Sequence, residues 1–399
     1  MGAKKMADEK VLAKVTVGRQ AFLDNLSTAK KTSGGSKKLA VLNYALVTIK
    51  NKVAVISATN LETAFVNVLT DAPDSDPLIY DTMRVLEIKK PDARVLINID
   101  KVLKIVKKFS KSRDRITLEV CGSDEKNPVP WFRIDGKFTL LDCMNPDDYP
   151  VIPHPHYTRF YPAMDYDALN LINIGVWKDE TRAHLKSILF DRENGYYACT
   201  DGSRLHLHRM PPVTGLKQIL FPKAALELLN SPYLKKARTD LVCMDKTGVF
   251  VYMLLETGFV CSRLYDGDFP KYMEVIDSDL TSILSMSDKS KLVELLAEAQ
   301  AIGDGSSYQG LIMSFNGSFN ITATNPDLGE YCHDVPAEVY SFCGNDGKTM
   351  MNPSHLIDGI NLVPSKGVNI YFTCDYCGPA IIETPDRSIV AAVMPMRLE

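Results

Sequence analysis

The feature that most limits the fold of this chain is an internal repetition of strand endings. Three segments end alike: VAVISATNLE at 53–62, GYYACTDGSR at 195–204 and FNITATNPDLGE at 319–330. In each, an apolar run leads through a small residue and a Thr to Asn60, Asp201 or Asn325. These Asx residues stand about a domain length apart, and self-similarity at such a period is typical of repeated structural units. The sequence therefore predicts three copies of one unit.

Two helix candidates accompany each strand ending. RQAFLDNLSTAKK, AMDYDALNLINIGV and DKSKLVELLAEAQAI precede the endings, and NIDKVLKIVKKF, FPKAALELL and MNPSHLIDGINLV follow them behind helix boundary signals. Runs rich in β-branched and aromatic residues, such as VCMDKTGVFVYMLL and RSIVAAVMP, fill the intervals and predict strands. We expect an α+β fold of three repeated domains, each with two helices packed on antiparallel sheets. Their predicted bounds are 1–150, 151–276 and 277–399.

Length and composition are consistent with several cores. The chain has 399 residues, of which 45% are apolar, and this is too long for a single core. No run approaches the roughly 18 apolar residues that a membrane span needs. The nine cysteines are scattered and suit reduced thiols. We therefore expect a soluble, cytoplasmic protein.

One pair of cysteines offers an alternative. Cys374 and Cys377 in FTCDYCGP have the spacing of a redox motif or of half a zinc site. A redox motif should open a helix, however, whereas here a strand-like run meets Gly378 and Pro379 and a second strand-like run follows. A hairpin turn is the favoured interpretation, and a thiol-based redox enzyme using both cysteines is the alternative.

The polar stretch YACTDGSRLHLHRM at 197–210 looks like catalytic equipment. Ser203 is not in a nucleophile elbow, and His206 and His208 have no nearby Asp, Glu or Cys that would complete a metal site. No phosphate-binding glycine motif occurs. Because Asp201 recurs as an Asx in all three units, strand-end turn chemistry is the better interpretation. We expect no catalysis, no metal and no cofactor.

A helix candidate in the first unit carries charge of one sign. In DKVLKIVKKFSKSRDR at 100–115, an apolar stripe recurs at helical spacing: Val102, Ile105, Val106 and Phe109. The lysines of a second face are Lys101, Lys104, Lys108 and Lys111. A solvated face is the plain alternative, but such faces usually mix charges, and Asp100 and Asp114 lie only at the ends. Since the net charge is −3, a ring with basic helices inside and acidic strands outside would account for both observations.

The C-terminal residues AAVMPMRL at 391–398 resemble the ending of the bacterial DNA polymerase III beta subunit family, the sliding clamps. ATNLE, CTDGSRL, DGDFPKYMEVI, ITATNPDLGE and NPSHLIDGINLV stand in the order of that family and extend the likeness over roughly residues 10–398. The resemblance implies a head-to-tail homodimeric ring around double-stranded DNA, held without sequence readout. It also implies a non-catalytic processivity factor that binds polymerase catalytic subunits, the clamp loader and repair proteins through short peptide motifs, with no membrane partner.

The resemblance also implies which residues line the ring. The DNA-binding candidates are Lys30, Lys31, Lys37, Lys38, Lys101, Lys104, Lys108, Lys111, Arg182, Lys186, Lys223, Lys289 and Lys291. Ala183 and His184 stand near Arg182, where the family often has aromatic residues. Flexible lysines suit a contact that must slide, whereas bidentate base contacts would pin the ring. A sequence-specific DNA-binding protein is the remaining alternative.

A hydrophobic cleft between the second and third domains is implied for partner peptides. Its candidate wall is Leu185, Thr200, Gly202, Ser203, Arg204, Leu205, Pro270, Val275, Val393, Met394, Pro395, Met396 and Arg397. Methionines suit a surface shared by several partners because their side chains repack easily. Ser203 replaces a His common in the family, Met273 and Glu274 replace basic residues, and Glu399 extends past the usual final Leu. We therefore expect a different preference among partner motifs.

The ring-closing interface is expected between an edge strand of the first domain and an edge of the third. Phe138 and Leu140 in KFTLL, facing Ile302 in EAQAIGDG, are the candidates. Without a partner they would be exposed apolar residues beside a strand edge, a hazard that dimerisation removes.

Overall fold

The computed structural model describes most of the chain. The described residues are 10–34, 39–50, 53–69, 93–122, 129–140, 142–155, 160–161, 164–175, 183–210, 218–245, 247–303, 310–315, 318–341 and 347–397. They form two compact units: unit 1 is Met1–Met164 with Ala224–Leu264, and unit 2 is Asp165–Lys223 with Tyr265–Glu399. Each unit is described by itself. The expected middle domain, 151–276, contributes to both, and the three predicted domain bounds stay a prediction.

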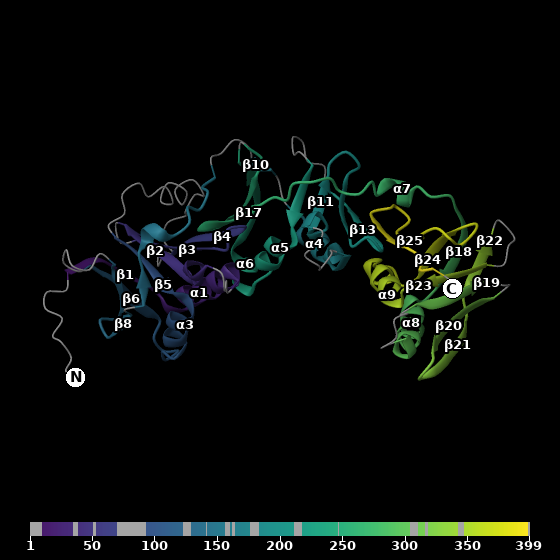
Figure 1. The fold of residues 1–399 in the computed structure, drawn as a ribbon, viewed down its shortest axis with the longest axis horizontal. Coiled ribbons are helices and arrows are strands. Elements are labelled where there is room, and N and C mark those ends of the chain that lie inside the picture. Colours follow the sequence, from purple (N-terminus) through teal and green to yellow (C-terminus); the bar gives the residue numbers. More distant parts are fainter. Residues whose placement is uncertain are drawn as a thin grey trace. The chain divides into compact units, whose positions relative to one another are not determined.

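Unit 1 contains two antiparallel sheets and a set of helices (Figure 1). Its strands are β1 (Lys10–Gly18), β2 (Tyr44–Lys50), β3 (Val53–Thr59), β4 (Thr63–Leu69), β5 (Ala93–Asn98), β6 (Arg115–Gly122), β7 (Trp131–Ile134), β8 (Phe138–Leu140), β9 (Cys143–Met144), β10 (Phe160–Tyr161), β15 (Arg238–Met244), β16 (Phe250–Leu255) and β17 (Gly258–Arg263). Its helices are α1 (Arg19–Ser33), α3 (Ile99–Lys107), α5 (Lys223–Leu229) and α6 (Pro232–Ala237), with short 3₁₀ turns at Ala40–Asn43 and Pro146–Asp148.

Unit 2 has the same kind of architecture. Its strands are β11 (Ser187–Asp191), β12 (Tyr196–Thr200), β13 (Arg204–Arg209), β14 (Ile219–Pro222), β18 (Leu280–Met286), β19 (Leu311–Phe315), β20 (Phe319–Asn325), β21 (Gly329–Val335), β22 (Glu338–Ser341), β23 (Gly347–Met351), β24 (Val368–Thr373), β25 (Ala380–Glu383) and β26 (Ile389–Val393). Its helices are α4 (Tyr166–Ile172), α7 (Met273–Ile276), α8 (Lys289–Gly303) and α9 (Pro353–Leu362), with 3₁₀ turns η3 (Asn173–Gly175) and η4 (Ala183–Lys186). The α+β class and the antiparallel sheets predicted from the sequence are confirmed.

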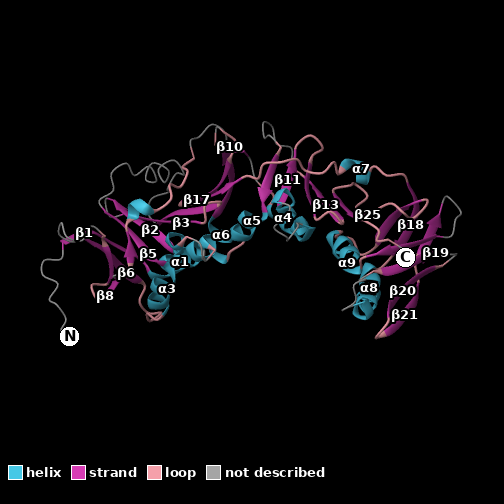
Figure 2. Ribbon diagram, viewed as in Figure 1, coloured by secondary structure: helices cyan, strands magenta, loops and turns pink. Residues whose placement is uncertain are grey.

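The six predicted helices form, and their starts follow the local sequence. Asn98 and Asn352 stand just before α3 and α9, and their side-chain oxygens accept hydrogen bonds from the backbone N–H groups of Lys101 and of Ser354. Such caps satisfy donors that a helix start otherwise leaves unpaired. In each unit taken alone, the long helices lie on one side of the strands (Figure 2).

Sheet order shows how the repeated segments join. In unit 1 the described strands run β10-β15-β16-β17-β4-β3-β2-β5-β9, and in unit 2 they run β14-β11-β12-β13-β26-β25-β24-β18-β22. The joins are β17 with β4 and β13 with β26. A strand that follows an Asx residue thus pairs with the last strand of the next predicted repeat in both units. The smaller sheets run β1-β6-β7-β8 and β21-β20-β19-β23.

The β4–β17 join is tightly packed. Gly258 pairs with Asn67, and a Cβ added to Gly258 would lie 2.1 Å from the carbonyl oxygen of Val66, so no larger residue fits without a backbone shift. The Asn67 amide is buried and donates to the Asn25 side chain and to the Tyr233 hydroxyl, both at 2.8 Å. These contacts attach α1 and α6 to the same strand, which fixes the local geometry of the join.

Apolar cores cover both faces of the two large sheets. In unit 2, Val393 and Ala391 pack with Leu356 and Ile360 of α9, whereas Ala392 and Leu205 belong to a second cluster on the other face. Every residue of β4 and of β26 is buried. Strands covered on both faces need apolar residues throughout, which explains why the sequence of these strands is nearly continuous in apolar residues.

Candidate functional site

The three strand endings found in the sequence form the same turn. The side-chain oxygen of Asn60 accepts from the backbone N–H groups of Glu62 and Thr63, and Asp201 does the same for Ser203 and Arg204. Asn325 accepts from the second and third residues after it. Such Asx turns close a strand end with short side chains. The interpretation of Asp201 as turn chemistry is confirmed.

The turn at 200–204 lies beside the C-terminal strand, as the sequence predicts. Arg204 is paired with Val393 in the β13–β26 ladder, and the backbone N–H of Met394 donates to the carbonyl oxygen of Ser203 at 2.8 Å. The Thr200 hydroxyl donates to the Arg204 carbonyl oxygen at 2.6 Å and accepts from the N–H of Gly202. Hydrogen bonds therefore hold two candidate segments, far apart in the sequence, side by side.

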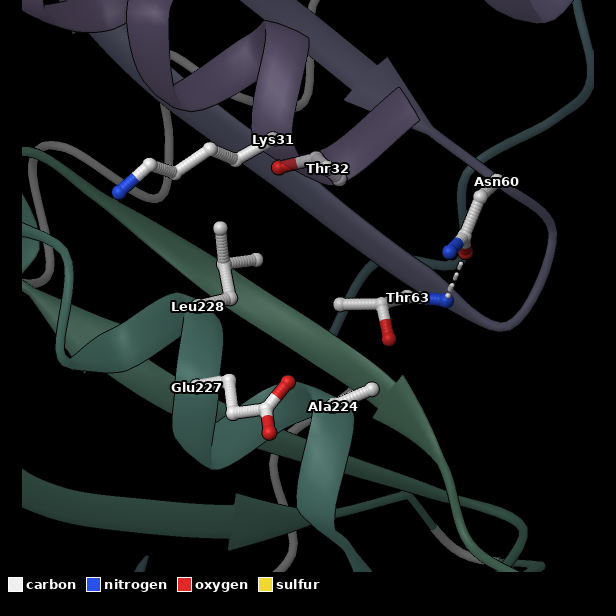
Figure 3. A pocket seen from close by; sticks show the side chains of 7 residues that line it. All are labelled: Lys31, Thr32, Asn60, Thr63, Ala224, Glu227 and Leu228. Carbon is white, nitrogen blue, oxygen red and sulfur yellow. Dashed lines mark hydrogen bonds between the residues drawn. The ribbon is translucent and has the colours of Figure 1, made fainter. Parts of the chain in front are cut away.

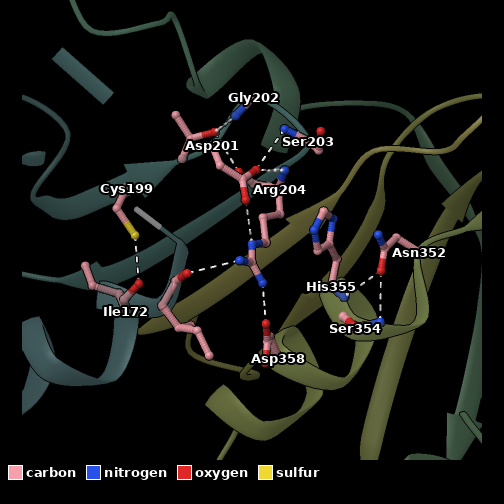
Figure 4. Close-up of polar contacts among 12 residues, drawn as sticks. Ile172, Cys199, Asp201, Gly202, Ser203, Arg204, Asn352, Ser354, His355 and Asp358 are labelled. Atoms are coloured by element: carbon pink, nitrogen blue, oxygen red, sulfur yellow. Dashed lines mark hydrogen bonds and ion pairs between the residues drawn. The ribbon is translucent and has the colours of Figure 1, made fainter. Parts of the chain in front are cut away.

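Arg204 connects three elements of unit 2 (Figure 4). Its guanidinium donates to the Asp201 carboxylate at 2.8 Å, to the carbonyl oxygen of Ile174 at 3.1 Å and to the Asp358 carboxylate of α9. Its side chain is only 10% exposed. Planar, multidentate contacts of this kind are what a guanidinium makes best. Arg204 therefore acts as an internal crosslink beneath the turn, and a partner could contact little of it.

Residues of α9 next to Arg204 were missed by the sequence analysis. His355 and Asp358 lie in NPSHLIDGINLV, a segment that was used for the family resemblance but given no site role. Burial, together with the nearby Arg204 charge, lowers the pKa of His355. The signal was present in that motif, yet its meaning depends on α9 being placed against β13, which a single sequence does not show.

The remaining wall candidates divide into buried and exposed groups. Leu185 and Val393 are fully buried and Leu205 is nearly so, because their side chains point into the cores. Val275 is partly buried and packs in the cluster that contains Leu205 and Tyr272. The residues open to solvent are Gly202, Ser203, Pro270, Met394 and Arg397, and those half exposed are Pro395 and Met396.

Leu185 and Val393 thus correct one expectation. They support the wall from behind and offer no surface to a partner in this conformation. Met394, in contrast, is 39% exposed. The next segment is held in place because the Met396 N–H donates to the Met350 carbonyl oxygen at 2.7 Å.

The loop before α7 is fixed by a buried tyrosine. The Tyr272 hydroxyl donates to the Asp191 carboxylate at 2.7 Å, and its N–H donates to the Pro270 carbonyl oxygen at 2.8 Å. Burial and the neighbouring Asp191 carboxylate raise the pKa of Tyr272, so the phenol stays protonated. Pro270 and Val275 are therefore attached to the edge of the same sheet that carries the turn.

The lysine face predicted on α3 is present. Lys101, Lys104, Lys108 and Lys111 are exposed, while Ile99, Val102, Leu103 and Val106 face the core. Ile105 and Phe109, expected in the buried stripe, are only partly buried, since the stripe is centred on Leu103. The sequence missed an acidic neighbour: the Lys101 ammonium lies 2.6 Å from the Asp142 carboxylate. Hydrogen bonding between them raises the pKa of Lys101 and lowers that of Asp142.

The other basic candidates occupy varied settings. Lys30 pairs with Asp100 at 2.5 Å, Lys31 and Lys291 are exposed, and Lys186 and Lys223 are half exposed. The Lys289 ammonium donates to the Ile360 carbonyl oxygen at 3.4 Å and to that of Val363, so it caps the end of α9. That contact satisfies carbonyl groups at a helix C-terminus, and it makes Lys289 a poorer DNA ligand than expected. Lys37, Lys38 and Arg182 lie outside the described residues.

The interface candidates are placed unequally. β8 is at the end of its sheet among the described strands, and Phe138 is 40% exposed, as expected of an edge residue. Leu140 is only 8% exposed, which contradicts the expectation for it, because strand alternation turns it toward the core. Ile302 is partly buried against the core under α8.

The cysteines differ from the expectation of reduced thiols throughout. Cys374 is disulfide-bonded, whereas Cys377 is a free, exposed thiol, so the two are not bonded to each other. The segment between them is the turn of a β24–β25 hairpin, closed by the Tyr376 N–H donating to the Thr373 carbonyl oxygen at 3.1 Å. The hairpin interpretation of this motif is confirmed.

His206 and His208 do not form a reactive pair. His206 is buried, and desolvation lowers its pKa to about 4, while His208 is half exposed and contacts the Arg209 carbonyl oxygen. Among the described residues, no three His, Cys, Asp or Glu side chains gather in a way that could hold a metal ion. None of the helices within the described ranges combines the length and the apolar character required to cross a bilayer.

Comparison with known proteins gives a consistent result. No protein-family model matches the chain. The beta sliding clamp of Halalkalibacterium halodurans is 19% identical over 369 residues, covering 90% of this chain and 92% of that protein. The beta sliding clamp of Salmonella typhimurium is 23% identical over 407 residues, covering 96% and 100%.

Solved structures share the fold. The DNA polymerase sliding clamp of Bacillus subtilis superposes with a TM-score of 0.78 at 17% identity, covering 97% of this chain and 99% of that one. The Pseudomonas aeruginosa sliding clamp, determined bound to griselimycin, has a TM-score of 0.76 at 18% identity and covers 96% and 99%. Since curated relatives match nearly the whole sequence and solved clamps match the fold, the chain belongs to the beta sliding clamp family, that of the DNA polymerase III beta subunit.

Proposed function

We propose that this protein is a homodimeric sliding clamp that encircles duplex DNA and holds DNA polymerase III and other replication and repair proteins on it. It does no chemistry of its own and serves as an accessory subunit. The names of its relatives support this proposal, and the pattern of strand pairing supports it independently. We place the activity in the cytoplasm, on the nucleoid.

The observation that carries the ring is the way the Asx-turn strands pair. The strand after Asn60, β4, pairs with β17, and the strand after Asp201, β13, pairs with β26. In both cases the partner is the last strand of the next repeat. The strand after Asn325, β21, ends its sheet among the described strands, and so does β8, the last strand of the equivalent hairpin in the first repeat. Pairing of β21 with β8 of a second copy follows the same rule and closes a head-to-tail ring.

Charge and exposure favour this pairing. Lys137 and Phe138 are exposed at β8, and Arg113 lies beside Phe109 on the same side. At β21, Glu330 and Asp334 are exposed, and the Tyr331 hydroxyl donates to the Glu298 carboxylate of α8 at 2.9 Å. A basic edge facing an acidic one steers the two copies into the head-to-tail arrangement and disfavours like-to-like pairing. Ile302, near the end of α8, would lie next to this contact.

Loose contact with DNA follows from the lysines. Lys104, Lys108 and Lys111 are exposed on one side of α3 and offer mobile point charges to phosphates. Phosphate contacts carry no sequence information and weaken with salt, so they allow sliding. Retention would then depend on the closed ring. Lys30, Lys31, Lys186, Lys223 and Lys291 are further candidates, with Lys37, Lys38 and Arg182 outside the described residues.

The partner surface is proposed at the join of β13 with β26. Exposed Ser203, Pro270 and Met394 and the half-exposed Met396 offer a mixed apolar surface to an extended peptide. Thr200, Gly202, Leu205, Val275, Pro395 and Arg397 complete it, while Leu185, Arg204 and Val393 support it from below. Ser203 and Glu274 in place of the usual basic residues would change which peptide motifs are preferred.

The deciding experiment measures retention on DNA of two topologies. Purified protein is loaded on nicked circular DNA and on linear DNA of the same sequence, and its release is followed at several salt concentrations. A ring stays on circles and slides off linear ends, and linearising a loaded circle releases it. Equal retention on both topologies, or preference for one sequence among linear duplexes, would refute the clamp and favour sequence-specific binding.

A further inference from the structure

A cavity of about 270 Å³ opens within unit 1, where the β3–β4 turn meets the ends of two helices (Figure 3). Lys31 and Thr32 come from α1, Asn60 and Thr63 from the turn, and Ala224, Glu227 and Leu228 from α5. Thr32, Thr63 and Leu228 are buried and form its floor, whereas Lys31, Ala224 and Glu227 are exposed at its rim. The space is larger than single waters require and suits a long side chain.

The cavity has a counterpart in unit 2, where the space is filled. Thr63 and Arg204 occupy the same position: each is the third residue after the Asx, and each donates its backbone N–H to that Asx side chain. Each carbonyl oxygen accepts from a preceding Thr hydroxyl, that of Thr59 or of Thr200. Each residue also begins a strand that joins the next repeat. The two positions are equivalent in backbone structure and differ in side chain.

The side chain at this position decides whether the space is filled. In unit 2 the guanidinium of Arg204 reaches Asp201 on the turn, Asp358 on α9 and the Ile174 carbonyl oxygen beyond α4. In unit 1 the corresponding walls are Asn60 on the turn, Glu227 and Leu228 on α5, and the end of α1. Thr63 is too short to cross this space, and its hydroxyl pairs with that of Ser262 at 3.3 Å. The first join therefore has the walls of an arginine site but no arginine of its own.

We propose that this cavity binds an arginine side chain presented by a partner protein. The carboxylate of Glu227 accepts from the guanidinium, the Asn60 side chain provides a polar wall, and Leu228 with the Thr32 and Thr63 methyl groups packs on the aliphatic stem. The Lys31 ammonium on the rim opposes a cation, although Figure 3 shows it extending away from the Glu227 carboxylate. The site lies within unit 1 alone and does not depend on ring closure or on the partner surface of unit 2.

The test uses blocked amino acids as probes. N-acetyl-arginine amide is titrated into the full-length protein and followed by NMR, with N-acetyl-lysine amide and N-acetyl-citrulline amide as matched controls. Lysine keeps the charge and loses the planar fork, and citrulline keeps the shape and loses the charge. We expect millimolar binding of the arginine amide, at least about five-fold tighter than either control, because one charge-assisted contact supplies most of the selectivity.

Three variants connect that binding to the cavity. Thr63→Arg supplies the missing side chain internally and should abolish binding, and Glu227→Gln, at an exposed helix position, should weaken it about five-fold or more. Lys31→Ala should strengthen it about two-fold, since a repelling charge is removed. Circular dichroism confirms that each variant is folded, and Glu227→Gln decides the matter if Thr63→Arg does not fold. Equal binding of the three probes, no arginine binding up to tens of millimolar, or unchanged binding in Glu227→Gln would overturn the proposal.

Discussion

The ring of Phe138 on the edge strand β8 lies 5.2 Å from the ring of Phe109 at the end of α3. The Arg113 guanidinium stands over the other aromatic partner, 4.9 Å from the Phe109 ring centre. An apolar residue that is 40% exposed is thus held in a fixed position by its neighbours and is not free to fold away from solvent. Such a side chain on a sheet edge is well placed to meet a second copy of the chain.

Replacing Phe138 by Asp should separate the proposed dimer. A carboxylate cannot be buried without a partner at an apolar contact, so the solution mass by light scattering should fall to that of one chain. Ile302→Asp should act in the same way from the other side. Val151→Asp, at an apolar residue that is almost fully exposed, serves as the control and should remain dimeric. If Phe138→Asp keeps the mass of the parent protein, the interface lies elsewhere.

Neutralising Lys104 and Lys108 should shorten the lifetime of the protein on DNA and reduce its dependence on salt. For every phosphate that a lysine no longer neutralises, the slope of log affinity against log salt should become shallower by about 0.9, with no change in sequence preference. Binding to short duplexes across a salt series measures this slope. Lys348→Gln, at an exposed lysine on β23, should leave the slope unchanged. A double variant with the parent slope would remove these lysines from the DNA-binding surface.

Replacing Arg204 by Lys should destabilise unit 2. Lysine keeps the charge but cannot donate to Asp201, Asp358 and Ile174 together, and leaving carboxylates poorly paired at this nearly buried site costs about 2–4 kcal/mol. Differential scanning calorimetry should show a lower Tm. Asp358→Asn should do the same, and the double variant should lose less than the sum of the two. Arg263→Lys, at an exposed arginine, is the control, and additive losses would show that Arg204 and Asp358 do not act together.

Lowering the pH below about 6.5 should destabilise unit 2 through His206. Its pKa of about 4 in the folded protein lies below the ordinary value of 6.5, so the unfolded chain binds the proton first as the pH falls. The stability that the neutral ring contributes is complete above pH 6.5 and is lost toward pH 4, in total about 3 kcal/mol. Arg204, Asp201, Cys199 and His355 are the polar groups that face this ring.

The measurement compares the parent protein with His206→Leu by denaturant unfolding between pH 7 and pH 5. The variant should lose the part of the pH dependence that belongs to this histidine. Val260→Ala, which removes methyl groups from a buried site without a titrating group, should be less stable by a similar amount at every pH. A parent-like slope in His206→Leu would assign the pH dependence to other groups.

Much of the local structure could be predicted from the sequence. The Asx positions predict turns because their side chains reach the next backbone N–H groups within a few residues, and Asn60, Asp201 and Asn325 all do so. The starts of α3 and α9 follow from Asn98 and Asn352 for the same reason. The exposed lysine face of α3 follows from helical spacing alone. These features depend on contacts between near neighbours in the chain.

Errors in the site arose where a side chain meets an element far away in the sequence. Leu140 and Val393 are apolar residues of short strands, and pattern alone does not say which face of the sheet is covered by a helix and which is open. Lys289 looked like a DNA ligand until α9 placed its terminal carbonyl groups within reach of the ammonium. The Cys374 disulfide likewise contradicts an expectation based on composition and spacing.

The sequence by itself determined the three-fold repetition, the turns, the helix caps and the lysine face, because each depends on spacing within one turn or one helix. Only the tertiary structure decided that Arg204 is bound to Asp358 while Thr63 leaves a cavity at the equivalent place. Both outcomes depend on a helix packing against a strand from another part of the chain. The charges and volumes that meet there are set by three-dimensional contact and not by neighbourhood in the sequence.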